Sequence, residues 1–327
     1  MSQHFLLSKA ARSLSLSAVA RMSEGEAREA FTAIRWAETA GKPFCPRCGC
    51  ASVYAYASRR IYKCQGCKHQ FTITSGTIFA SRKLPVRDIL LAIAIFVNGA
   101  KGHSALQLSR DLNVQYKTAF VLAHKIREAI ASEGVSKVGG NGKPVEIDGA
   151  YFGGYIKPAN WREHRRDRRL ARNQNGKRRC VVVMRERRGK TLPFICRTED
   201  QAVPEIKDRV AAGSVVYADE AGGWEPLHAR YLTKRINHKE AYSDGEACTN
   251  QAESFFSRIR RAEIGTHHHI AGPYLAAYAD EMSWREDNRR TSNGELYLMA
   301  ANAAVKHPTS KQWKGYWQRR VIREAAE

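Results

Sequence analysis

Four cysteines in two closely spaced pairs are the clearest candidates for chemistry in this sequence of 327 residues. Cys45 and Cys48 lie in CPRC, Cys64 and Cys67 lie in CQGC, and 15 residues separate the two pairs. Each C-x2-C turn directs two thiolates toward one point, and four thiolates form a typical structural zinc site. The intervening residues read as a small hairpin with little core. We therefore expect one structural Zn²⁺ ion to stabilise a zinc ribbon over residues 43–83.

The other cysteines give no comparable pattern. Cys50 and His69 lie next to the two pairs and are alternative zinc ligands, although we interpret them as polar residues of the turns. Cys180, Cys196 and Cys248 stand singly in apolar or loop segments, so we expect them to be free thiols.

Two aspartates end two short runs of strand type. VEIDGAYFGG alternates Val145 and Ile147 with acidic residues and reaches Asp148, whereas SVVYADEAGG reaches Asp219. Alternation and β-branched residues predict strands, in which Asp is unfavourable. Each Asp is therefore either the first residue of a solvated turn or a ligand for a metal ion.

A third acid lies on a predicted helix, CTNQAESFFSRIRRAE. At about 100° per residue, one face of this helix is apolar and is expected to pack against a sheet. Glu253 falls on the neighbouring polar stripe, together with Asn250 and Arg260. Glu253 is thus either a metal ligand at the edge of the buried face or part of a capping box with Asn250 as the N-cap.

The elements that must position these acids predict an α/β fold. Further strands are predicted in RRCVVVMRER and TLPFICRT, and a helix is predicted in VPEIKDRVA. We interpret residues 145–290 as a ribonuclease-H-like mixed sheet with flanking helices, in which the first and fourth strands are parallel neighbours. Neighbouring strands lie about 4.8 Å apart, so Asp148 and Asp219 would share divalent ions. Mg²⁺ prefers such oxygen ligands.

Residues 84–131 have helical periodicity. A short predicted helix in SALQLSRDLN, a turn at Asn113 and a longer helix in VQYKTAFVLAHKIREAIA form a helix-turn-helix-like pattern. We place Lys117, His124, Lys125 and Arg127 off the apolar stripe of the longer helix, and we expect Lys117 and Lys125 to contact DNA. An ordinary three-helix packing unit with solvated charges is the alternative interpretation.

The charge balance favours a polyanionic partner. Lys and Arg number 54 against 32 Asp and Glu, which gives a net charge of +22 and a pI near 9.9. Residues 157–179 hold ten Lys or Arg against two acids and are expected to form a loop that contacts phosphates. The residues proposed for these contacts are Arg165, Arg166, Arg168 and Arg169. No segment has the run of about 18 apolar residues of a membrane span, so we expect a cytoplasmic protein acting on DNA and no membrane partner.

The remaining segments complete the expected organisation. Residues 1–42 form an N-terminal helical segment, and the Gly-rich residues 132–144 form a linker. Residues 291–327 form a helical tail, in which Trp313 and Trp317 are expected to pack in a helix rather than to stack on bases.

The ordered set of motifs from about Pro43 to Arg290 resembles bacterial insertion-sequence transposases of the zinc-ribbon DDE class. The motifs are CPRC with CQGC, VEIDGAYFGG, VYADEAGGW, NQAESFFSRIRR, GTHHHI and YADEMSWREDNRR. The resemblance implies that Asp148, Asp219 and Glu253 are the catalytic acids and hold two Mg²⁺ or Mn²⁺ ions. Asn250 is a lesser candidate for the third position. Arg260 stands where the family often has Lys, and His238 is either near the DNA ends or a structural histidine.

The resemblance also implies an activity and partners. The protein would cut the terminal inverted repeats of an insertion sequence and transfer the 3′-hydroxyl to target DNA by two-metal phosphoryl transfer. Double-stranded DNA and further copies of the chain would be its partners. Two other classes remain open: a catalytically inactive or domesticated DNA-binding regulator, and a metal-dependent structure-specific nuclease.

Overall fold

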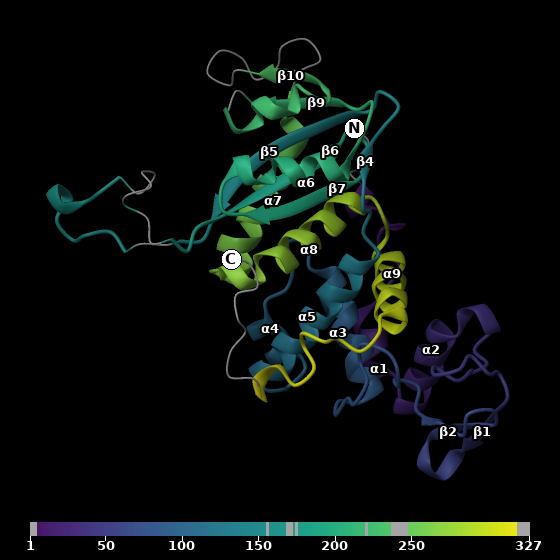
Figure 1. Cartoon of the computed structure of the whole chain (residues 1–327). Coiled ribbons are helices and arrows are strands. Elements are labelled where there is room, and N and C mark those ends of the chain that lie inside the picture. The colour runs from purple at the N-terminus through teal and green to yellow at the C-terminus, as the bar shows by residue number, and fades with distance from the viewer. Residues whose placement is uncertain are drawn as a thin grey trace. The chain divides into compact units, whose positions relative to one another are not determined.

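The computed structural model is mixed α/β and describes residues 5–154, 157–167, 173, 176–219, 222–236 and 248–318. The chain divides into two compact units (Figure 1). The first combines Met1–Glu133 with Asn288–Arg323, and the second contains Gly134–Asp287. None of the helices in the described ranges is both long enough and apolar enough to span a bilayer.

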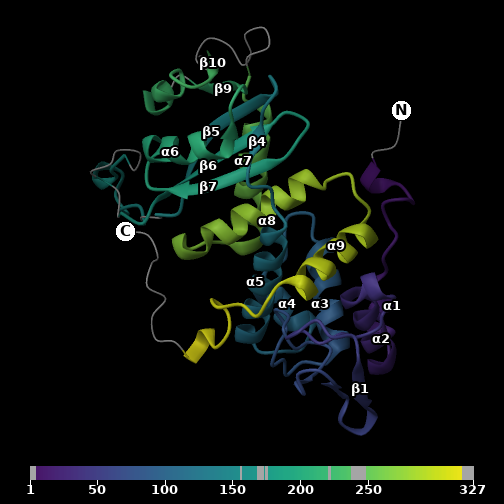
Figure 2. The ribbon, with the colours of Figure 1, turned by 45° about the vertical axis from the view of Figure 1, so that its right-hand side comes forward.

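The first unit has α3 (Val86–Asn98) at its centre, with most of its residues buried. The other helices are α1 (Leu16–Arg21), α2 (Glu24–Arg35), α4 (Ala105–Asp111), α5 (Tyr116–Ser132) and α9 (Asn293–Lys306). Of these, α1, α2, α5 and α9 pack against α3. Although α9 comes from the C-terminal part of the chain, it packs against α2, α3 and α5 (Figure 2). The Asn293 Oδ1 atom accepts hydrogen bonds from the backbone of Ser13 and Leu14, so the N-terminal segment is held to this late helix.

The pair α4 and α5 is joined by a tight turn. Ser104 caps α4, and Asn113 adopts a φ of 50° in the turn. The sequence placed His124 and Arg127 off the apolar stripe of α5, but this was wrong, because both are 1% exposed. Trp313 stacks on the His124 ring at 4.3 Å, and the Arg127 guanidinium lies 5.5 Å from the Phe96 ring. These aromatic partners come from outside the helix, so the periodicity of α5 alone could not show the burial.

A small antiparallel sheet follows α2. It consists of β1 (Val53–Tyr56), β2 (Ile61–Cys64) and β3 (Gln70–Phe71). Trp36, at the end of α2, is buried and makes edge contacts with the rings of Phe44 and Tyr62. The hairpin is therefore anchored to a helix by aromatic packing.

The second unit contains a five-stranded sheet with the order β10-β9-β5-β6-β7. Its strands are β5 (Pro144–Phe152), β6 (Arg179–Glu186), β7 (Thr191–Cys196), β9 (Val215–Asp219) and β10 (Leu232–Ile236). The strands β5, β6 and β7 pair antiparallel, whereas β9 pairs parallel with both β5 and β10.

Helices cover both faces of this sheet. Val182 and Met184 pack with α6 (Val203–Arg209) in one core cluster. Val181 and Val183 point to the other face and pack against α7 (Asn250–Ala262) and α8 (Leu275–Asp287). Alternate side chains of β6 thus pack into the two hydrophobic cores on opposite faces of the sheet, which explains why the strand is apolar at successive positions.

The sequence predicted a linker over residues 132–144. In the structure, residues 138–144 are instead packed as part of the second unit. Here β4 (Val138–Gly139) pairs with β8 (Val210–Ala211), and Val138 is buried. Gly139 has a φ of 84°, and a Cβ atom there would lie 2.2 Å from Ser214 Oγ. Glycine is therefore required by close packing at this position rather than by flexibility.

Candidate metal and active sites

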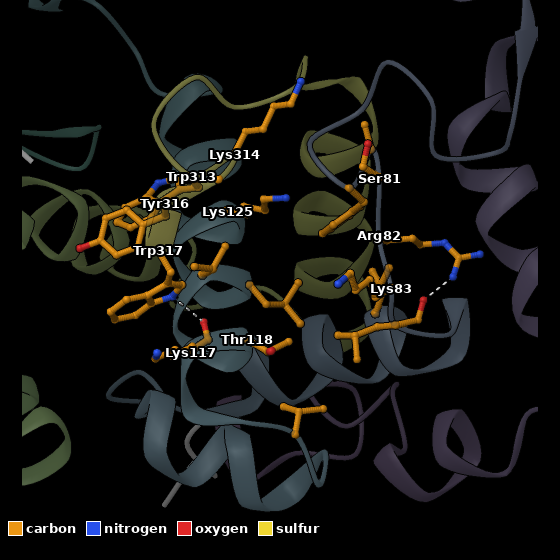
Figure 3. Close-up of a pocket in the computed structure, with 18 of the residues that line it drawn as sticks. Ser81, Arg82, Lys83, Lys117, Thr118, Lys125, Trp313, Lys314, Tyr316 and Trp317 are labelled. Atoms are coloured by element: carbon orange, nitrogen blue, oxygen red, sulfur yellow. Dashed lines mark hydrogen bonds between the residues drawn. The ribbon is translucent and has the colours of Figure 1, made fainter. Parts of the chain in front are cut away.

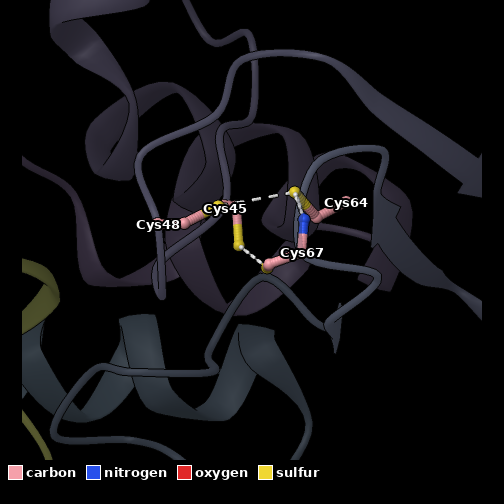
Figure 4. A group of neighbouring side chains, drawn as sticks. All are labelled: Cys45, Cys48, Cys64 and Cys67. Carbon is pink, nitrogen blue, oxygen red and sulfur yellow. Dashed lines mark hydrogen bonds between the residues drawn. The ribbon is translucent and has the colours of Figure 1, made fainter.

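The four paired cysteines meet at one point beside the β1–β2 hairpin (Figure 4). We call residues 45–71, which contain these cysteines and the small sheet, the zinc hairpin. Cys45 and Cys67 sulfurs lie 3.6 Å apart, and so do those of Cys48 and Cys64. All four sulfurs lie within 4.8 Å of one another. Tetrahedral Zn²⁺ with bonds of about 2.3 Å requires sulfurs separated by slightly less than 4 Å, so the geometry suits one structural Zn²⁺ ion.

Backbone hydrogen bonds shape the two cysteine turns. The Cys67 N–H donates to Cys64 Sγ at 3.4 Å, and this hydrogen bond lowers the pKa of that thiol. A lowered pKa favours the thiolate, which is the form that binds metal. Cys50 Sγ instead points to Ser52 O at 3.7 Å, and His69 stacks on Phe71. Neither alternative ligand belongs to the sulfur group.

Asp148 and Asp219 lie on adjacent parallel strands. The β5–β9 ladder pairs Ile147 with Ala218, so the next residue on each strand is one of the two aspartates. The expectation that Asp148 ends its strand was wrong. Pairing with β6 continues to Phe152, and Asp148 stands instead where the parallel ladder ends.

Asp148 lies in an acidic, half-buried environment. Burial raises its pKa to about 7, against the effect of the Gly149 N–H, which donates to Asp148 Oδ1 at 2.7 Å. Asp219, Glu253 and Glu199 raise this pKa further by charge repulsion. Asp219 and Glu253, the other two acids found in the sequence, therefore both act electrostatically on Asp148. Within the described residues the oxygens of these three acids do not all approach to within 4.8 Å, unlike the cysteine sulfurs.

Glu199 is a fourth acid that the sequence did not single out. It begins the short 3-10 helix Glu199–Ala202 after β7. A Cβ atom on Gly149 would lie 2.7 Å from Glu199 Cγ and 2.8 Å from Oε1. Burial, and then the charge of Asp219, raise the pKa of Glu199. The only sequence signal was the glycine after Asp148, which admits this carboxylate beside the strand.

The helix that carries Glu253 is held by a carboxylate on β5. Glu146 Oε2 accepts hydrogen bonds from the backbone of Gln251 at 2.8 Å and of Ala252 at 3.1 Å. Glu146 is fully buried, and its carboxylate satisfies two N–H groups of the first turn of α7. The strand that carries Asp148 therefore also fixes the helix that carries Glu253.

This arrangement replaces the capping box considered from the sequence. Thr249 is the N-cap of α7, and its side chain makes no capping bond to the helix backbone. Asn250 is the first residue of the helix and is exposed. Glu253 is also exposed, and its carboxylate lies 3.5 Å from Thr249 Oγ1. Glu146 performs the cap from 105 residues away, so sequence spacing near α7 could not reveal it.

Arg187 completes the support of Glu146. Its Nε atom donates to Glu146 Oε1 at 2.8 Å, and its Nη2 atom donates to Cys248 O at 2.9 Å. The guanidinium also lies over the Tyr217 ring of β9 at 4.2 Å. Arg187 thus connects β5, β9 and Cys248, the residue before the N-cap of α7. Its positive charge also balances the negative charge of the buried Glu146 carboxylate.

The cationic candidates fall in several places. Arg260 is exposed on α7, with its guanidinium 5.1 Å from the Phe152 ring of β5. Arg165 and Arg166 are exposed, and Arg165 donates to Ala159 O and Asn160 O. Lys117 is exposed, whereas Lys125 is half-buried, which lowers its pKa. The remaining candidates lie outside the described residues; they are His238, Arg168 and Arg169.

Comparisons with known proteins identify similarity to transposase domains and to a protein of a transposable element. Residues 139–287 match the ISXO2-like transposase domain, and residues 22–70 match the transposase zinc-ribbon domain. The chain is also similar to an uncharacterized protein in transposable element ISH50 of Halobacterium salinarum. The two are 26% identical over 274 residues, which cover 79% of this chain and 90% of the relative. No solved structure gives a significant match.

Loss of one paired cysteine should remove the metal. Cys64→Ser is expected to reduce zinc from one ion per chain to well below one and to lower the melting temperature, because the hairpin has little core of its own. Elemental analysis and thermal unfolding measure the two effects. Cys50→Ser is the matched control and should retain one zinc ion. Full zinc content in Cys64→Ser would contradict this assignment.

Loss of the Glu146 charge should destabilise the second unit. Glu146→Gln leaves Arg187 without its anionic partner and weakens the cap of α7, so we expect a loss of about 3 kcal/mol in the free energy of unfolding. Urea denaturation measures this change. Glu163→Gln, at an exposed glutamate, should change stability by less than about 0.5 kcal/mol. Equal effects of the two substitutions would disprove the anchoring role.

Asp148 should make the metal-free protein less stable as pH rises. Its folded pKa of about 7 exceeds its ordinary value, so the folded state binds more protons and loses stability between about pH 4 and pH 7. Asp148→Asn removes this loss and should be more stable than the unsubstituted protein by about 1–3 kcal/mol at pH 8, with a smaller difference at pH 4. Urea denaturation at both pH values, with the exposed Asp208→Asn as control, tests the sign. A difference that shrinks with rising pH would refute it.

Proposed function

Because this chain belongs to the insertion-sequence transposases through its ISXO2-like transposase domain and its transposase zinc ribbon, we propose that it cuts the ends of an insertion sequence and joins them to target DNA. The reaction would be phosphoryl transfer, with cleavage followed by attack of the freed 3′-hydroxyl on a target phosphodiester. The observation that supports this proposal is that Asp148 and Asp219 directly follow the last pair of the parallel β5–β9 ladder, where Asp219 and Glu253 both raise the pKa of Asp148.

The sheet supports a ribonuclease-H-like core. In chain order its five main strands are β5, β6, β7, β9 and β10, and the first and fourth are parallel neighbours. This is the arrangement that brings two strand-borne aspartates to adjacent positions. The proposed catalytic domain extends over residues 134–287, the second unit, because β4 packs as part of this unit.

We propose that the acids are the ligands of two divalent cations, Mg²⁺ or Mn²⁺. Asp148 faces three other acids, and their mutual repulsion is the conflict that bound cations relieve. When bound, such ions stabilise the attacking and leaving oxygens of a phosphoryl transfer. Asp148, Asp219 and Glu253 would hold them, and Glu199 supplies a further carboxylate beside Asp148.

Residues around the acids would position Glu253 and hold the DNA. Glu146 and Arg187 hold α7 in place, so that Glu253 keeps its position relative to Asp148. Arg260 lies two turns after Glu253 on the exposed side of α7 and would hold a phosphate. Asn250 lies one turn before Glu253 and remains the lesser candidate for the third position.

The proposed partners are duplex inverted repeats and target DNA. The zinc hairpin, the α4–α5 pair and the exposed Arg165 and Arg166 would contact them, and the net charge of +22 favours such binding. Joining two ends of one element requires that two active sites be held together. We therefore propose that the protein acts as a homo-oligomer on DNA.

The catalytic proposal predicts the effect of single isosteric changes. Asp219→Asn and Glu253→Gln should each lower Mg²⁺-dependent cleavage of an oligonucleotide carrying the element's end by at least about 10²–10³-fold, since each removes a charge from the site. Asn250→Ala, at the lesser candidate for the third position on the same helix, should keep most of the activity. Gel analysis of labelled DNA measures the rates.

The products of the same assay separate the alternatives. Products joined through a 3′-hydroxyl to target DNA support a transposase, whereas hydrolysis without joining identifies a nuclease. A chain that binds the ends but never cuts them, in Mg²⁺ or Mn²⁺, would be a DNA-binding regulator. If Asn250→Ala is inactive and Glu253→Gln is active, the third role passes to Asn250.

A further inference from the structure

A hollow of about 520 Å³ lies in the first unit, outside the proposed active site (Figure 3). Its walls are residues 79–84, the N-terminal half of α5 and residues 313–317. Figure 3 shows the aromatic side chains of the C-terminal segment on one side and residues 81–83 on the other, with α5 between them. The volume falls within the range of small-ligand sites, about 300–1,000 Å³.

The charges around the hollow are all of one sign. Lys83, Lys117, Lys125 and Lys314 line it together with Arg82, which is turned toward Leu84 O. Within the part of the chain that the structure describes, no acidic residue lines the hollow. Glu128 acts on Lys125 from further along α5 but is not part of the wall. The ligand that complements this wall is therefore an anion.

The other wall is aromatic. Trp313 and Tyr316 are buried against Phe120 of α5, with ring centroids 6.0 Å and 6.1 Å from it. Trp317 is 46% exposed, and its Nε1 atom donates to Lys117 O at 3.2 Å. The hydrogen bond orients the indole, and the Lys117 Nζ atom lies over the same ring, 5.4 Å from its centroid, although nearly half of the residue stays accessible. Such a ring is a ready platform for a planar group.

The position of this wall also bears on how α5 meets DNA. A helix that reads duplex DNA needs a convex, accessible face in the major groove. Here the side of α5 that carries Phe120 and His124 is covered by the C-terminal aromatic residues. Beside this covered side lies a hollow lined by cations and aromatic rings, and this is the chemistry that binds single-stranded nucleic acid.

We propose that this hollow binds an unpaired nucleotide of the DNA substrate, with the base against Trp317 and the phosphate near Lys83 and Lys125. This inference rests on the proposed function, which supplies DNA as the partner. It adds that the DNA contains unpaired nucleotides. A duplex end with unpaired nucleotides would be held here in addition to the contacts made by paired DNA.

The test compares two fluorescein-labelled duplexes of identical paired sequence, one blunt and one with three unpaired nucleotides at a 3′ end. Fluorescence anisotropy at fixed salt gives the dissociation constants for the full-length protein. We expect the overhang to improve binding about tenfold, the effect of stacking one base. Trp317→Ala and Lys83→Gln should remove most of this preference and leave binding of the blunt duplex within about twofold.

Two variants control for structural damage and general charge loss. Trp317→Phe keeps an aromatic surface and should retain part of the preference, and Lys101→Gln removes an exposed lysine elsewhere in the unit and should retain all of it. Equal binding of the two DNAs by the unsubstituted protein, or an unchanged preference in Trp317→Ala, overturns the proposal while leaving a duplex-binding transposase intact. Failure to bind either DNA overturns both.

Discussion

The buried carboxylate of Glu146 at the N-terminus of α7 is the contact on which the arrangement of the acids depends. It accepts two backbone N–H groups of the helix and pairs with Arg187. Because Glu146 and Asp148 are two residues apart on β5, the same strand carries a catalytic candidate and fixes the helix of Glu253. A charge fully removed from water is expensive unless it is paired and hydrogen-bonded, and here both conditions are met.

The acids near Glu146 differ from it, because among the described residues Asp148 is surrounded by other negative charges rather than paired with a positive one. Asp148 is half-buried, and its pKa is raised first by burial and then by the negative charges of Asp219, Glu253 and Glu199. Gly149 allows Glu199 to approach, so the crowding is built into the backbone rather than left to mobile side chains. Under the proposed function, divalent cations would relieve this repulsion, and the net charge of +22 would favour phosphate nearby.

The first unit uses its charges differently. Arg127 and His124 are buried against aromatic rings, whereas the lysines around the hollow remain at its rim or within reach of solvent. The C-terminal residues 313–317 turn one side of α5 from a helix surface into the floor of an aromatic and cationic hollow. Trp313 does so from a turn, not from the helix expected for the tail, because its packing partners lie on α5.

The sequence alone determined what depends on short spacing. Two C-x2-C turns, the strand of Asp148 and the two-faced helix of Glu253 could be recognised because their ligands or periodic faces lie within a few residues. The roles of Glu146 and Glu199, the burial of His124 and the packing of the Gly-rich segment were decided only by tertiary structure. Their partners lie tens to more than a hundred residues away, and no local pattern records which distant backbone N–H, ring or carboxylate will meet them.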